Sequence, residues 1–142
     1  MKKDKDIFLG RRVMIHPDIT TDPIGMAGQI GTVINSDTER RTITVGFPDN
    51  RFGVYQDDTV LLLRSKKELL SLYHSKYNGL TSDEREMAMH VFKALTKGDT
   101  MSALQLARAT PVVMDICTIS GDTFREIQGQ IRQVKKELRR QL

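Results

Sequence analysis

The sequence predicts an α+β protein in which a small five-stranded β-barrel, residues 10–64, precedes a bundle of four or five helices, residues 65–142. Two observations predict this order. Up to residue 63, short runs of alternating or β-branched apolar residues are separated by turns rich in Gly, Pro, Asn and Asp. After residue 65, the apolar spacing becomes that of amphipathic helices. Five short strands in so little chain cannot close a sandwich, but they can curl into a small barrel.

The five expected strands follow a tail and a long loop. Residues 1–9 are charged and are expected to form a flexible tail. The first strand is centred on Val13 and Ile15, and a loop with several prolines and glycines then runs from His16 to Gly28. The other four strands are expected over Ile30–Ile34, Thr42–Phe47, Phe52–Tyr55 and Val60–Leu63.

Helix starts are predicted where a capping residue precedes an apolar run. Ser65 with Glu68, and Thr81 with Glu84, have the spacing of a capping box. Asp99 can cap a third helix. A fourth is expected to begin at Thr110-Pro111, because proline suits the first helical position. Gly121-Asp122 is expected to end that helix and to cap the last one.

The last helix carries two patterns. Its apolar residues alternate at intervals of three and four, as in a coiled-coil seam: Phe124, Ile127, Ile131, Val134 and Leu138. Five basic residues lie off this seam: Arg132, Lys135, Lys136, Arg139 and Arg140. Three interpretations remain open at this stage. The helix packs in the bundle, it pairs with a second copy as a homodimer, or its basic face contacts nucleic acid or an acidic partner.

The net charge of +4 comes from the end of the chain. Residues 1–64 hold nine basic and nine acidic residues, whereas the stretch from Arg125 onward holds six basic and two acidic ones, which is again +4. A role in nucleic-acid binding would therefore belong to the last helix. The single cysteine, Cys117, excludes an internal disulfide, and no apolar run suggests a signal peptide or a membrane span. A cytoplasmic protein without a membrane partner is predicted.

Motifs for catalysis are not found. The glycines of residues 25–31 precede a β-branched strand and lack dinucleotide-binding spacing, so they are interpreted as bends. The three histidines and Cys117 match no zinc spacing, and Asp57-Asp58 is interpreted as a solvated turn. The chain is therefore predicted to be non-enzymatic and to need no metal or other cofactor.

One group of residues predicts a peptide-binding site on the rim of the barrel. Aromatic rings and carboxylates at successive strands and turns suit a cationic peptide, through cation–π contacts and charge-assisted hydrogen bonds. The six residues are Phe47, Asp49, Phe52, Tyr55, Asp57 and Asp58. The alternative is structural, with both phenylalanines in the core and Tyr55 half-buried.

The barrel segment also carries motifs of a known kind. Val13, Pro17-Asp18, the run Gly28-x-x-Gly31-Thr-Val33, the run Val45-Gly-Phe-Pro-Asp49 and Tyr55 occur in that order. In this respect residues 10–63 resemble Src-homology-3-like small barrels, in particular the Mind bomb/HERC-type domain of ubiquitin ligases. The chain lacks the tryptophans that this family favours.

The same glycine motif is similar, more loosely, to the KOW motif of transcription and ribosomal proteins. The first resemblance implies binding of protein tails, and the second implies RNA or the transcription machinery. The leading hypothesis is thus a non-catalytic protein-interaction module whose barrel rim binds a peptide. The alternative is a nucleic-acid-associated factor that uses the basic last helix.

Overall fold

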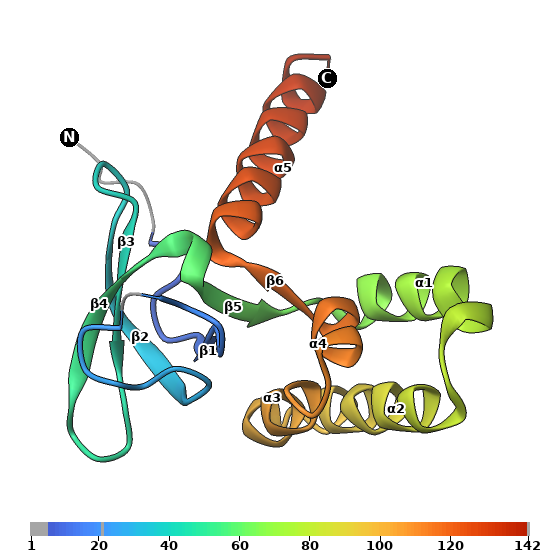
Figure 1. Ribbon diagram of the computed structural model, residues 1–142. Coiled ribbons are helices and arrows are strands. Elements are labelled where there is room, and N and C mark those ends of the chain that lie inside the picture. Colours follow the sequence, from blue (N-terminus) through green and yellow to red (C-terminus); the bar gives the residue numbers. More distant parts are fainter. Residues whose placement is uncertain (1–5, 21, 142) are drawn as a thin grey trace.

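The computed structural model describes residues 6–20 and 22–141. Figure 1 shows a twisted sheet on one side, a cluster of helices beside it, and a final helix that projects away from both. The strands are β1 (Arg12–Ile15), β2 (Ile30–Asp37), β3 (Thr42–Gly46), β4 (Phe52–Gln56), β5 (Val60–Leu63) and β6 (Thr118–Ser120). The helices are α1 (Lys66–Lys76), α2 (Ser82–Thr96), α3 (Thr100–Ala107), α4 (Pro111–Cys117) and α5 (Gly121–Gln141), with short 3₁₀ turns at Asp57–Thr59 and Tyr77–Gly79.

The predicted α+β class is confirmed, whereas the closed five-stranded barrel is not. The strands form one open antiparallel sheet in the order β4-β3-β2-β1-β5-β6. The sixth strand comes from the helical half of the sequence, where Ile119 pairs with Leu62. Its three residues lie between two helices and are too few to produce a visible alternation, so the sequence suggested a direct passage from α4 to α5.

The starts of α1 to α4 follow the predicted caps, whereas the prediction for Gly121-Asp122 is wrong: α4 ends at Cys117, before β6, and Asp122 lies inside α5. Thr81 and Glu84 form a complete capping box at the start of α2. Ser65, Asp99 and Thr110 each accept a hydrogen bond from the backbone N–H three residues later, at the starts of α1, α3 and α4. These helices begin where expected because a cap is a local interaction that needs no distant partner.

Phe8, before the first strand, and Phe124, on the last helix, complete the core of the sheet. Phe8 is fully buried, and its ring lies 5.5 Å from that of Phe124 on α5. The prediction of a flexible tail is therefore wrong at Phe8, while residues 1–5 of that tail lie outside the described residues. Ile119 on β6 belongs to the same core. Residues from both sides of the expected domain boundary at residue 64 therefore share this core.

The other helices have a core of their own, centred on Leu69, Val91 and Ile116. A third cluster joins these helices to the sheet; it consists of Met14, Ile30, Leu61, Leu104 and Met114. The outer surface of the sheet near β4 and the far half of α5 are left uncovered by these cores. Within the described ranges, no helix is both long and apolar enough to cross a membrane.

Candidate interaction surfaces

Strand β4 forms one free edge of the sheet. The backbone hydrogen bonds from Phe47 N to Arg51 O and from Asp57 N to Arg41 O, each 2.9 Å, bracket its pairing with β3. Because backbone groups alternate in direction along an antiparallel strand, those of Phe52 and Val54 point away from β3. Neither residue has another backbone partner within the part of the chain that the structure describes. The edge can therefore accept hydrogen bonds from, and donate them to, an added strand.

Apolar side chains accompany this edge on the outer face of the sheet. Phe52 is 64% exposed and Val54 is 54% exposed. Ile34 on β2 is also exposed. It lies at the bulge between Val33 and Asn35, and its side chain lies beside Gly46 of β3. Most soluble proteins protect such an edge with charge or proline, whereas this edge is both unpaired and apolar.

A groove of about 500 Å³ runs beside the edge, between β4 and the loop after β1. Its lining residues are Asp18, Ile19, Thr20, Pro23, Val54, Tyr55, Gln56, Asp58 and Thr59. Two of them, Asp18 and Asp58, are exposed carboxylates, and none is basic. The groove therefore combines an apolar wall with negative charge.

The loop wall of this groove is held in place by Asp22. Its carboxylate accepts hydrogen bonds from Ala27 N at 2.6 Å, from Ile24 N at 3.3 Å and from the hydroxyl of Tyr55 at 3.2 Å. Burial tends to raise the pKa of Asp22, but the backbone hydrogen bonds, with that of Met26 first, outweigh it and lower the pKa. Burial, followed by the charge of Asp22, raises the pKa of Tyr55 to about 12. The pair is thus a stable carboxylate–phenol contact that anchors the loop to β4.

The six residues predicted to form a peptide site do not share one surface. Phe47 and Tyr55 are buried, with their rings edge to face and 6.5 Å apart. Asp49 lies in the β3–β4 turn and pairs with Arg51 at 2.7 Å. The exposed residues of the set are Asp49, Phe52 and Asp58. They lie at different points along β4, so the rim does not form a single aromatic and acidic cluster.

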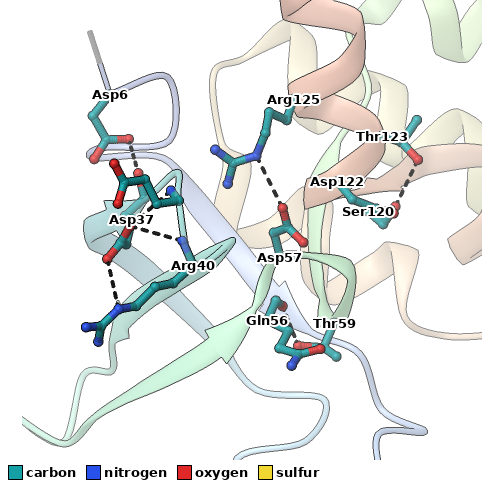
Figure 2. Close-up of polar contacts among 12 residues, drawn as sticks. Asp6, Asp37, Arg40, Gln56, Asp57, Thr59, Ser120, Asp122, Thr123 and Arg125 are labelled. Carbon is teal, nitrogen blue, oxygen red and sulfur yellow. Dashed lines mark hydrogen bonds and ion pairs between the residues drawn. The ribbon is translucent and has the colours of Figure 1, made fainter. Parts of the chain in front are cut away.

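Asp57, the sixth residue, is 4% exposed and lies between the sheet and α5. Figure 2 shows its carboxylate beside Arg125, whose Nε lies 3.2 Å from Asp57 Oδ2. Nη2 of Arg125 is buried and has no hydrogen-bond partner among the described residues. The interpretation of Asp57 as part of a solvated turn is therefore wrong: it is one half of a buried ion pair.

The five basic residues of the last helix are all exposed; Arg132 lines a pocket with Phe8 and Ser36 of the body, and the other four lie farther along α5. The five are Arg132, Lys135, Lys136, Arg139 and Arg140. None makes an ion pair within the described ranges. The basic charge is thus available to a partner, but it lies on α5 and away from the β4 edge.

The described residues include no group of three or more His, Cys, Asp or Glu that could hold a metal ion. Cys117 is buried, and this burial raises the pKa of its thiol to about 12. A thiol in this state is a core residue and a poor nucleophile.

Sequence reasoning missed Val54, Ile34 and Asp18, which line the edge and the groove. One signal could have identified the edge. Side chains alternate between the two faces of a strand, so Phe52 and Val54 lie on one face of β4 and Tyr55 on the other. The strand is therefore apolar on both faces. Comparison with protein-family models, with curated proteins and with solved structures found no match for this chain.

Proposed function

We propose that this chain is a protein-interaction module that binds an extended, basic peptide as an additional strand along the edge of β4. The single observation that carries the proposal is the free backbone of Phe52 and Val54 on an exposed apolar edge strand. Strand addition uses main-chain hydrogen bonds for affinity and side-chain pockets for specificity.

The preference for a basic peptide follows from charge. Asp18 and Asp58 line the groove beside the edge, and no basic side chain accompanies them. Lysine or arginine side chains of an added strand would reach these carboxylates, while alternate apolar side chains would cover Phe52 and Val54. The resemblance of residues 10–63 to Src-homology-3-like barrels supports the same class of function, because it implies binding of protein tails.

A fluorescent peptide of alternating lysine and valine residues tests this proposal by anisotropy, with an alternating glutamate–valine peptide as the control. We expect only the basic peptide to bind. Val54→Pro removes the outward N–H without breaking the ladder to β3, so it is expected to abolish binding while the fold is retained. Val54→Ala keeps the N–H and is expected to weaken binding only about two- to fivefold.

Hydrogen exchange gives an independent measure of strand addition. On addition of the basic peptide, the amides of Phe52 and Val54 should become protected, whereas those of Gly53 and Tyr55 already donate to β3 and should change little. Unchanged binding to the Val54→Pro variant, or protection elsewhere on the surface instead, would contradict strand addition.

A second candidate function is nucleic-acid binding by α5. The observation that favours it is the set of five exposed basic side chains without ion pairs among the described residues. Each phosphate contact makes binding more salt-dependent. Binding of duplex DNA or RNA that falls steeply with salt, and that is lost on Arg132→Gln together with Arg139→Gln, would support this candidate; absence of binding at low salt would exclude it.

A further inference from the structure

We propose that the far half of α5 pairs with the same segment of a second copy of this chain, with the two helices parallel. This segment, residues 129–141, is exposed along its whole length and projects beyond the body of the protein (Figure 1). Isolated helices shorter than about 12–15 residues are marginal in water, since most helix stability in proteins comes from packing. The segment continues the packed first half of α5, but it has no buried residue of its own, so a partner surface would stabilise it.

The apolar stripe of the segment has the spacing of a coiled coil. Ile131, Val134 and Leu138 are 42%, 53% and 55% exposed. They continue the intervals that begin at Phe124 and Ile127, which pack in the core of the sheet. We call the three exposed residues the α5 seam. A stripe this narrow matches the seam of two paired helices better than the wider face that a helix presents to a globular core.

The body of the protein lies beside the α5 seam rather than over it. Gly121 and Phe124 are buried, and Arg125, Ile127 and Gln128 are half-buried, so the first two turns of α5 face the sheet over a broad arc. From Gly129 to Gln141 every residue of α5 is exposed, so the body of the protein does not cover the seam. A second helix can therefore approach the seam from the side without displacing the sheet.

The two flanks of the α5 seam differ in charge, and this difference favours a parallel over an antiparallel arrangement of two copies. One flank carries Lys135 and, further out, Arg139, while the other carries Gln130 and Glu137. In a parallel pair, the first flank of each helix faces the second flank of its neighbour, so Lys135 meets the neutral Gln130 of the second copy. An antiparallel pair would bring one basic flank against the other.

Salt dependence separates this pairing from binding of an anionic polymer or lipid surface. Each segment carries five basic residues and Glu137, a charge of +4. Two such segments repel each other overall, so salt screens the repulsion and should preserve or strengthen the pair. Attraction to phosphate groups would instead weaken as salt rises.

Sedimentation of the full chain over a range of concentrations tests the pairing. We expect a reversible monomer–dimer equilibrium that persists at high salt. Val134→Asp places a charge in the seam and should raise the dimer dissociation constant at least about tenfold, whereas Lys136→Ala, on the opposite side of the helix, should not raise it. A monomer at all concentrations up to about 1 mM, the weak end of the affinity scale, would overturn the proposal.

A disulfide trap tests the orientation. Leu138→Cys places two thiols face to face only in a parallel pair, so mild oxidation should yield a covalent dimer. Arg140→Cys, away from the seam, is the matched control and should yield little. The native chain serves as a second control, because Cys117 is buried. A dimer whose Leu138→Cys variant fails to cross-link, or cross-links no faster than the Arg140→Cys variant, would overturn the parallel arrangement.

Discussion

Arg125 on α5 and Asp57 at the start of the turn between β4 and β5 form a buried ion pair, with Nε 3.2 Å from Oδ2. The guanidinium also lies over the ring of Phe8, 4.9 Å from its centroid. One residue from the last helix thus contacts both the turn and the start of the chain. This contact joins elements that are far apart in the sequence, and it fixes where α5 leaves the body of the protein.

Breaking this ion pair is expected to destabilise the fold. Arg125→Met would leave the carboxylate of Asp57 buried without a counter-charge, at a cost of about 3–5 kcal/mol. Urea unfolding followed by circular dichroism measures the loss. Asp58→Asn, at the exposed neighbouring carboxylate, is the control and should change stability by less than about 0.5 kcal/mol. Equal stability of the Arg125→Met variant and the native chain would show that the pair contributes nothing.

Two glycines of α5 should respond in opposite directions to alanine. A Cβ at Gly121 would meet the backbone carbonyl oxygen of Asp57, which cannot move without disturbing the turn, so Gly121→Ala should cost about 1–3 kcal/mol. A Cβ at Gly129 would meet open space, and alanine there should favour the helix by up to about 1 kcal/mol. Circular dichroism and urea unfolding compare the helicity and stability of the two variants. If Gly121→Ala were as stable as Gly129→Ala, or more stable, this packing would be refuted.

Stability in acid should depend on Asp22. Its pKa is lowered in the folded state, so the carboxylate contributes stability above the unfolded pKa, near 4, and loses it as the pH falls through the folded value. Asp22→Asn removes this contribution. The difference in unfolding free energy between the native chain and this variant should therefore be largest near pH 6 and shrink toward about pH 3. A difference that stays constant over this range would argue against a lowered pKa.

Cys117 should be inert in the folded protein. Burial limits the access of reagents to its thiol and raises the pKa of the thiol to about 12, so the thiolate fraction is low at neutral pH. A thiol reagent should label it slowly in buffer and fully in denaturant, which makes the reaction a reporter of unfolding. Ser75→Cys, at an exposed position on α1, supplies a rapidly labelled control. Rapid labelling of Cys117 under native conditions would contradict its burial.

The local parts of the fold could be predicted from sequence. The four N-caps, the five helices and the first five strands depend on contacts between residues close in the chain, such as Thr81 with Glu84. The candidate binding surface was only partly predictable. Phe52 and Asp58 were identified, but the sequence could not distinguish exposed Phe52 from buried Phe47, since both are aromatic residues next to the same turn.

The sequence by itself determined the α+β class, the boundaries of most elements and the basic, heptad-spaced character of the last helix, because these follow from short-range patterns of apolarity and charge. Tertiary structure decided that Phe8 is core, that β6 extends an open sheet, that Asp57 is buried against Arg125, and that the α5 seam remains exposed. Each of these depends on which distant segments meet. Burial is a property of the folded chain, and the type of a side chain, apolar or charged, does not determine which surface it will contact.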